Sequence, residues 1–326
     1  MSKVSVCIIV RDEESILEKS LASIADIADE IIITDTGSTD NTIQIAKKFT
    51  NKIYHFPWID DFSSARNFTT QYAQYKYILR WDADFLLHPE DLAKVIKLKN
   101  NDFNNADLVY FTWNVEFDKQ NNAVKSIPNF FFYKREKFHW EFPIHNLLVL
   151  NDKNSESSAI QFPDIRVDHL KDRELKSYRY NQTKRILEKT LAQDPDNDRL
   201  QLNYAEHKIF TKDFESAIDI FQQVLSKNIY NTDKLSVLIE NLVMCYFQSG
   251  RTDEAKILVN QYYEKLSSEP RFILVYADAT SISDPFGAKE FYLKYIQNPL
   301  IPENTLYGFD YYRHIEHARK MLSNLT

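Results

Sequence analysis

The chain has 326 residues, 44% of them hydrophobic, and is therefore long enough to pack more than one domain. It contains 4 glycines beside 19 tyrosines and 22 phenylalanines, a composition that excludes a flexible linker or a low-complexity protein. The formal net charge is -7 and no segment carries a Lys/Arg cluster. Nucleic acid is therefore not expected as a partner, because neutralising its phosphates needs a dense basic surface.

Cysteine content and hydropathy bear on the location of the protein. Cys7 and Cys245 are the two cysteines, and without CxxC spacing they are not expected to form a disulfide framework or a thiolate metal site. The N-terminus shows no basic region followed by a cleavable apolar segment. No stretch approaches the roughly 20 apolar residues that cross a bilayer. We expect a cytoplasmic protein without a transmembrane segment, and the composition leaves homo-oligomerisation open.

Apolar runs and helical patterns alternate along the first part of the chain. Strands are predicted at residues 4–10, 30–34 and 53–56, with amphipathic helices at 16–24 and 43–49 between them. This alternation predicts a parallel sheet with helices on its faces.

A second group of elements continues the α/β pattern. We expect a helix at 68–75, a buried strand at 77–81 that ends in Asp82-Ala83-Asp84, and later strands at 108–115 and 130–133. The first domain is predicted to extend over residues 1–174.

The remainder, residues 175–326, carries a helical pattern throughout. In three segments an alanine follows a short charged or polar turn and leads into apolar residues at helical spacing: Ala217, Ala255 and Ala288. These positions are separated by 38 and 33 residues, close to the roughly 34-residue period of tetratricopeptide repeats, in which a small residue lets paired helices pack closely. We predict a helical-repeat domain here, and the alternative is an irregular helical domain.

The Asp82-Ala83-Asp84 triplet is the sharpest chemical signal. Two carboxylates at the carboxyl end of a buried strand can share a Mn²⁺ or Mg²⁺ ion and the diphosphate that it carries. Ligands of open α/β sheets bind at this edge. The alternative is that the two carboxylates cap a turn.

Three other motifs add candidate site residues. Asp35 ends an apolar strand ahead of the capping residues of the next helix, where it could bind a nucleobase or ribose, and the alternative is a well-capped turn. Arg66, near a helix start, could pair with phosphate or with the acidic pair, or form a surface ion pair. His145 and His169 could be metal ligands or proton-transfer groups. A structural role is expected for the other histidines of this part of the chain, His55, His88 and His139.

Taken together, these motifs resemble family 2 glycosyltransferases with the GT-A fold. Residues 4–14, DTGSTDNT at 35–42, FPWIDDFSSARNF at 56–68 and WDADF at 81–85 follow in that family's order and spacing. The resemblance implies a Rossmann-like, mixed and mostly parallel sheet. One branch of the family joins this domain to tetratricopeptide-like helices; it includes bacterial enzymes that act on lipopolysaccharide core sugars and others that glycosylate peptides on cysteine or serine.

The resemblance also implies roles for individual residues. Asp35 and Thr36 would contact the base and ribose of a UDP-sugar, with Asp12 or Glu13 nearby.

The other implied roles concern the diphosphate and the metal. Asp82 and Asp84 would be the DxD pair, with Asp84 the direct metal ligand, and Arg66 would lie near that pair and the diphosphate. His145 would approach the metal or the diphosphate.

Two positions depart from the family pattern. Asp12 stands where an Asn is usual. Asn146 follows His145 where related enzymes often have a Glu that could serve as the catalytic base, and an amide cannot accept a proton. Other groups would then take the proton: the carboxylates Asp168, Asp164 and Glu141, or His145.

These inferences predict an enzyme. We expect an inverting, metal-dependent glycosyltransferase that moves a sugar from a UDP-sugar to a peptide, protein or saccharide acceptor. The alternative is a catalytically inactive GT-A domain that serves as a binding scaffold through its helical repeats, which Asn146 would favour. A nucleotidyltransferase is disfavoured, because the segment after the first strand is not glycine-rich and basic.

Overall fold

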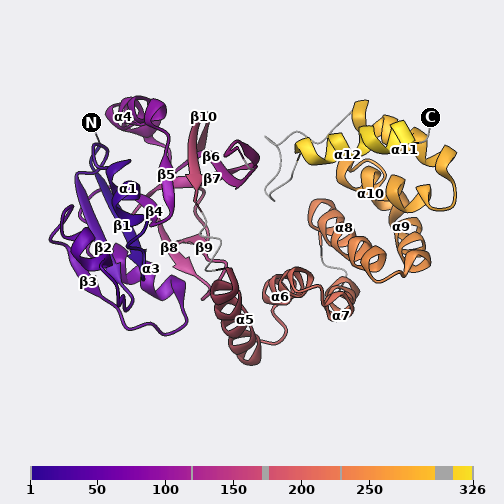
Figure 1. The fold of residues 1–326 in the computed structure, drawn as a ribbon, viewed down its shortest axis with the longest axis horizontal. Coiled ribbons are helices and arrows are strands. Elements are labelled where there is room, and N and C mark those ends of the chain that lie inside the picture. Colours follow the sequence, from indigo (N-terminus) through magenta and orange to yellow (C-terminus); the bar gives the residue numbers. More distant parts are fainter. Residues whose placement is uncertain (1, 119, 171–175, 228–229, 298–310, 325–326) are drawn as a thin grey trace. The chain divides into compact units, whose positions relative to one another are not determined.

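The computed structural model describes residues 2–118, 120–170, 176–227, 230–297 and 311–324 (Figure 1). The chain forms two compact units, Met1–Tyr180 and Asn181–Thr326. The domain boundary predicted between residues 174 and 175 lies in a segment outside the described residues, so its position stays a prediction.

The first unit is built on an eight-stranded sheet with the order β3-β2-β1-β4-β7-β6-β10-β5. The first four strands in that order are mutually parallel: β1 (Val4–Val10), β2 (Glu30–Asp35), β3 (Ile53–His55) and β4 (Tyr77–Asp82). The other four are β5 (Phe85–Leu87), β6 (Leu108–Phe117), β7 (Ala123–Lys134) and β10 (Ala159–His169). The mixed, mostly parallel sheet that we expected is confirmed.

The direction of the strands determines which residues meet. β7 is antiparallel to both β4 and β6, and β10 is parallel to β6, so β10 runs in the same direction as β4. The carboxyl ends of β1, β2, β4 and β10 therefore share one edge of the sheet. β5 pairs antiparallel with β10 at the other side and returns the chain from that edge.

Both faces of the sheet are buried, which explains why its central strands read as continuous apolar runs. Along β1, Val6 and Ile8 belong to the larger core, which includes Leu17 and Leu21 of α1 (Leu17–Ala22). Cys7 points to the opposite face and lies in a smaller core of Ile32, Ile78 and several aromatic rings. The remaining elements of this unit are α2 (Thr42–Ala46), α3 (Phe62–Thr70), α4 (Leu92–Asn100), the 3-10 turns η1 (Pro89–Asp91) and η2 (Asp102–Asn105), β8 (Phe138–Glu141) and β9 (Leu147–Leu150).

Some elements differ from the prediction. The helix expected at 68–75 begins at Phe62, because Asp61 caps it: the Asp61 Oδ1 accepts a hydrogen bond from the Ser64 N–H at 2.9 Å. β5, α4 and the β8–β9 pair were not predicted, nor was β10, whose side chains alternate between partly buried and exposed near its start.

The second unit consists of helices. They are α5 (Lys176–Gln193), which begins in the first unit, α6 (Asp198–Phe210), α7 (Phe214–Ser226), α8 (Thr232–Gln248), α9 (Thr252–Leu266), α10 (Pro270–Ser281), α11 (Pro285–Gln297) and α12 (Tyr311–Asn324). Successive helices from α6 to α11 pack as pairs. Ala217, Ala255 and Ala288 each lie in the first turn of the second helix of a pair, with no exposed surface. The predicted helical repeats are confirmed.

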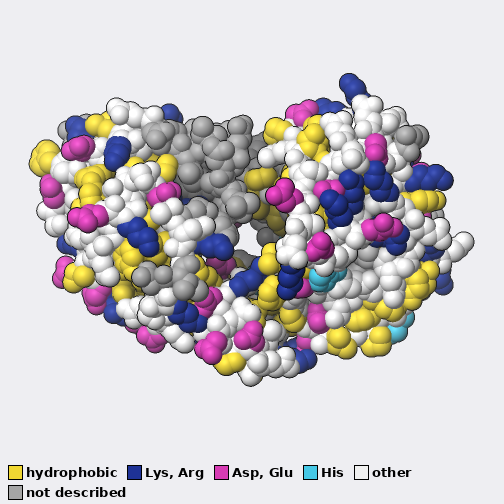
Figure 2. Space-filling view, turned by 180° about the vertical axis from the view of Figure 1, so that it is seen from behind, with side chains coloured by type: hydrophobic (Ala, Val, Ile, Leu, Met, Phe, Trp, Pro, Cys, Tyr) yellow, Lys and Arg dark blue, Asp and Glu magenta, His cyan; other side chains and the backbone are white. Residues whose placement is uncertain are grey.

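The distribution of surface charge and the apolar character of the helices bear on possible partners. Figure 2 shows one face of each unit, on which Lys and Arg side chains lie among Asp and Glu rather than in a continuous basic band. Among the described residues, no helix combines the length and apolar character needed to cross a membrane.

The buried alanines make the helical repeats sensitive to side-chain volume. Ala255→Leu should destabilise the second unit by about 1–3 kcal/mol, because added methylene groups have no room at a close helix contact. Urea unfolding followed by circular dichroism measures the change. Ala192→Leu, at an exposed position of α5, is the matched control and should be nearly neutral. Equal midpoints for the two variants would contradict close packing at Ala255.

Candidate active site

The loops after β1 and β2 form one side of the shared edge. The Asp12 Oδ1 accepts a hydrogen bond from the Thr39 N–H at 2.7 Å, and the Asp12 N–H donates to the Ser38 Oγ at 3.1 Å. The Glu13 N–H donates to the Thr42 Oγ1 at 2.7 Å. Asp12 adopts a left-handed φ of 52°, a region that Asn and Asp tolerate better than other non-glycine residues. The Asp at this position is therefore a mild departure from the usual Asn.

Asp35 and Thr36 belong to the same loops. The two carboxylate oxygens of Asp35 accept hydrogen bonds from the N–H groups of Ser38 and Gly37, at 3.0 and 3.2 Å. The Thr36 N–H and hydroxyl both donate to the Val10 carbonyl oxygen, at 3.0 Å each. The turn-capping alternative thus accounts for the hydrogen bonds of Asp35 without a ligand, and contact of this pair with a nucleotide stays a prediction.

Asp82 lies between two guanidinium groups. Its Oδ1 is 2.7 Å from the Arg66 Nη2 and its Oδ2 is 3.3 Å from the Arg80 Nη2. Burial alone would raise the pKa of the Asp82 carboxyl, but the positive charges of Arg66 and Arg80 outweigh burial and hold this pKa well below its usual range. Two cations beside one carboxylate leave an excess of positive charge, which suits the binding of a phosphate group.

The arginines are held from behind by aromatic rings. The Arg66 guanidinium lies 5.0 Å from the centre of the Trp140 ring, and that of Arg80 lies 5.3 and 5.4 Å from the Phe85 and Phe130 rings. The contact of Arg66 with the acidic pair was expected, whereas Arg80 was missed. A charged residue inside the buried strand β4 was the signal in the sequence.

Asp84, the second carboxylate of the triplet, pairs with a histidine from the far end of the unit. Its Oδ2 is 3.1 Å from the His169 Nε2, and its carbonyl oxygen accepts a hydrogen bond from the Leu170 N–H at 2.8 Å. The His169 ring stacks on Trp113, with ring centres 5.0 Å apart. Both Asp84 and the His169 side chain are largely buried. The fold thus brings His169, one of the two histidines considered, to the acidic triplet.

His145 and Asn146 lie in a turn fastened to the start of α3. The Asn146 Nδ2 donates hydrogen bonds to the Ser63 Oγ at 2.8 Å and to the Phe142 carbonyl oxygen at 2.5 Å. A glutamate could not donate to these two oxygens, so the amide has a structural role here. His145 is exposed and adopts a left-handed φ of 48°. Glu141 is half-exposed, with its Oε1 3.1 Å from the His139 Nε2.

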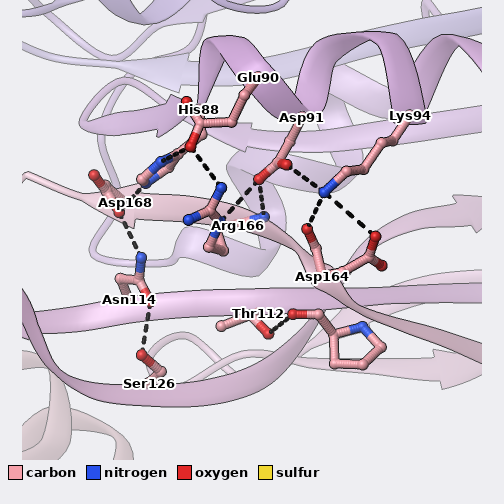
Figure 3. A network of polar contacts seen from close by, with 11 residues as sticks. His88, Glu90, Asp91, Lys94, Thr112, Asn114, Ser126, Asp164, Arg166 and Asp168 are labelled. Carbon is pink, nitrogen blue, oxygen red and sulfur yellow. Dashed lines mark hydrogen bonds and ion pairs between the residues drawn. The ribbon is translucent and has the colours of Figure 1, made fainter.

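The two aspartates of β10 have different surroundings (Figure 3). Asp168 is next to His169 at the carboxyl end of the strand, and its Oδ1 is 2.8 Å from the His88 Nε2 and 2.7 Å from the Asn114 Nδ2. Asp164 lies further back, at an irregularity between Phe162 and Arg166, and its exposed carboxylate is 3.3 Å from the Lys94 Nζ. The structure therefore brings Asp168, and not Asp164, to the edge that carries Asp84.

A divalent cation fits one pair of these side chains. Among the described residues, no three His, Cys, Asp or Glu side chains converge as a metal site, so Asp82, Asp84 and His145 do not form a preassembled one. Asp84 and His169 offer a carboxylate oxygen and an imidazole nitrogen 3.1 Å apart, and adjacent ligands of an octahedral ion with bonds of about 2.1 Å lie a similar distance apart. Mg²⁺ and Mn²⁺ sites commonly combine one or two protein ligands with phosphate oxygens.

Solved structures offer distant similarities. Staphylococcus aureus TarS is 13% identical, with a TM-score of 0.43 over 80% of this chain and 55% of that chain. Glucosyl-3-phosphoglycerate synthase from Mycobacterium tuberculosis, in complex with Mn²⁺ and UDP-glucose, is 20% identical, with a TM-score of 0.30 over 34% of this chain and 44% of that chain.

Curated relatives match shorter segments. The glycosyltransferase SunS of Bacillus subtilis is 40% identical over 28% of this chain and 22% of its own length. An uncharacterized glycosyltransferase of Rickettsia typhi is 33% identical over 28% of this chain and 30% of its own length. A TPR repeat-containing protein of Synechococcus elongatus is 49% identical over 26% of this chain. The chain spans 21% to 30% of the length of these relatives.

Two family models match in succession along the chain. Residues 5–151 match glycosyl transferase family 2, and residues 174–228 match the tetratricopeptide repeat. The first match covers β1 to β9 and includes Arg66, Asp82 and Asp84. Residues 5–151 are therefore similar to family 2 glycosyl transferases, and the segment that follows them is similar to the tetratricopeptide repeat.

Proposed function

We propose that this protein is an inverting, metal-dependent glycosyltransferase that moves a sugar from a UDP-sugar to a peptide, protein or saccharide acceptor. The observation that carries the proposal is the cluster at the end of β4. There the Asp82 carboxylate lies between the guanidinium groups of Arg66 and Arg80, and the Asp84 carboxylate, two residues on, pairs with His169. Apart from His169, which follows it in the chain, these residues belong to the segment that matches the family 2 model.

Donor binding would use both sides of the shared edge. Asp35, Thr36, Asp12 and Glu13, in the loops after β1 and β2, would contact the uridine. The diphosphate would lie against the Arg66 and Arg80 side chains. These two side chains carry two positive charges, and their shared partner Asp82 neutralises only one of them.

Asp84 and His169 would hold a Mn²⁺ or Mg²⁺ ion, with Asp82 two residues from Asp84, and His145 is a further candidate ligand. When bound, the ion supplies positive charge that stabilises the leaving diphosphate. Asp82 has a different task, because both its oxygens are engaged: it keeps the two arginines in place.

The transfer itself is a single displacement. The acceptor oxygen or sulfur forms a bond to the anomeric carbon as the bond from that carbon to the UDP oxygen breaks, so the configuration inverts and UDP leaves with the electron pair. We assign Asp168 as the base that takes the acceptor proton. Its place at the carboxyl end of β10, on the edge of the sheet that carries Asp84, supports this choice over Asp164, which lies further back on the same strand. Glu141 and His145 are the other candidates. A cysteine thiol, with a reference pKa near 8.5, would need less help than a sugar hydroxyl.

The helical repeats would bind the acceptor or a partner protein, since stacked helical repeats commonly present extended binding surfaces. A binding scaffold with an inactive transferase domain is the second candidate. It is favoured by Asn146, which replaces a carboxylate with an amide that is already engaged in two hydrogen bonds.

The first prediction concerns donor binding. UDP or one UDP-sugar should raise the melting temperature of the full chain in the presence of Mn²⁺, since a ligand at 100 times its Kd stabilises the folded state by about 2.7 kcal/mol. Asp84→Asn should lose the Mn²⁺-dependent part of this shift, and differential scanning fluorimetry measures it. Asp164→Asn should behave as the wild type. A protein that no nucleotide stabilises would support the scaffold.

The second prediction concerns the base. With donor saturating and peptide or saccharide acceptors supplied, Asp168→Asn should lower kcat by about 10²–10⁴-fold, the usual contribution of a positioned base. Asp164→Asn removes a carboxylate four residues earlier on the same strand and should retain the wild-type rate. Full activity of Asp168→Asn would exclude Asp168 as the base, and loss of activity in Asp164→Asn alone would reverse the assignment.

A further inference from the structure

A chain of hydrogen bonds converges on one oxygen of Asp168 (Figure 3). His88, which directly follows β5, brings its Nε2 to 2.8 Å from the Asp168 Oδ1, and Asn114 of β6 brings its Nδ2 to 2.7 Å from the same oxygen. Ser126 of β7 donates from its hydroxyl to the Asn114 Oδ1 at 2.7 Å. Side chains from three separate segments thus act on the Asp168 carboxylate, two of them directly and Ser126 through Asn114.

Each member of this chain fixes the orientation of the next. The ionised Asp168 carboxylate can only accept, so the Asn114 amide nitrogen has to face it; the amide oxygen then faces Ser126, whose hydroxyl donates to it. An ionised Asp168 can only accept hydrogen bonds, so His88 must carry its proton on Nε2. Asn114 is only 4% exposed, so water competes little for its two hydrogen bonds.

The two oxygens of Asp168 are therefore not equivalent. Oδ1 receives both hydrogen bonds, and among the described residues no donor reaches Oδ2. The side chain keeps partial access to solvent, with 16% of its surface exposed. A carboxylate held by one oxygen and open at the other has the arrangement that a proton acceptor requires, because orientation is fixed before the acceptor arrives.

The backbone of β10 does not require this network. Asp168 and Asn114 already lie opposite each other in the ladder between β10 and β6, and β5 pairs with the other side of β10. Apolar side chains would cover the strands equally well without placing four polar groups in a row. The network therefore needs an explanation beyond strand pairing.

We propose that His88 and Asn114 are positioning residues that hold the Asp168 Oδ1, so that Oδ2 takes the acceptor proton in a fixed direction. This inference rests on the assignment of Asp168 as the base under the proposed function. It adds two residues that do not touch the substrates. It also gives His88 a role that the sequence did not indicate, since a structural role was expected for this histidine.

Kinetics of single and double variants test the proposal. The probe is UDP-glucose with Mn²⁺, with release of UDP to water as the reaction, since the same base would act on water. His88→Phe and Asn114→Ala should each lower kcat about tenfold with KM for UDP-glucose unchanged, because a misplacement of about 1 Å can cost as much as 10²-fold in rate. His88→Gln should recover most of the rate, because the glutamine amide can donate from near the position of Nε2.

A double variant separates positioning from a general effect on folding. In an Asp168→Asn background, His88→Phe should cause no further loss, since residues that act through one group are not additive. An additive loss, or a raised KM with kcat unchanged, would overturn the proposal. If Asp168→Asn alone keeps the wild-type rate, the base assignment fails, while Mn²⁺-dependent binding of UDP-glucose still tests the donor site separately.

Crystal structures of the wild type and of Asn114→Ala provide a readout that does not depend on turnover. The Asp168 carboxylate should rotate or become disordered in the variant, with the fold and the positions of Asp84 and His169 retained. An unchanged Asp168 side chain in a well-ordered map would overturn the proposal. Lys94→Ala is the matched control, because it removes the ion-pair partner of Asp164, the other aspartate of β10. This variant should leave the Asp168 side chain in place.

Discussion

The rest of the candidate site depends on the two ion pairs that the Asp82 carboxylate forms with Arg66 and Arg80. Neither guanidinium group could remain in this largely buried position without an anion, and the carboxylate in turn stays ionised because of them. The cluster joins α3 to β4, and aromatic rings from β5, β7 and β8 close around the arginines. The end of β4 is thereby fixed, and with it the start of the segment that carries Asp84.

Strand direction explains how distant residues reach this point. Because β10 runs in the same direction as β4, His169 arrives at the edge where Asp84 lies, 85 residues away in the sequence. The sequence pattern predicted the parallel strands and the position of the acidic triplet, since apolar runs and their ends are local features. It could not rank His169 above His145, because the choice depends on the pairing of β5 with β10. Arg80 and the contacts of His88 were hidden for the same reason.

The polar loops show a second limit of prediction. The DTGSTDNT segment was recognised, but its side chains are largely used by the loop itself: Asp35 binds the backbone of its own turn, and Asp12 binds Thr39. Hydrogen bonds of this kind depend on exact backbone dihedrals, which composition does not specify. The helical repeats were easier to predict, because Ala217, Ala255 and Ala288 occupy equivalent close contacts and the same packing constraint recurs along the chain.

The burial of Cys7 has a practical consequence. Its thiol lies in the smaller core of the first unit, and burial raises the pKa of this thiol well above its usual range. Burial also raises the pKa of the Cys245 thiol, to about 11. Both cysteines are free and buried, so both should remain as protonated, inaccessible thiols at neutral pH. A cysteine introduced at the surface would then be the single reactive thiol of the folded chain. Maleimide dyes could report on either unit without prior removal of the native cysteines.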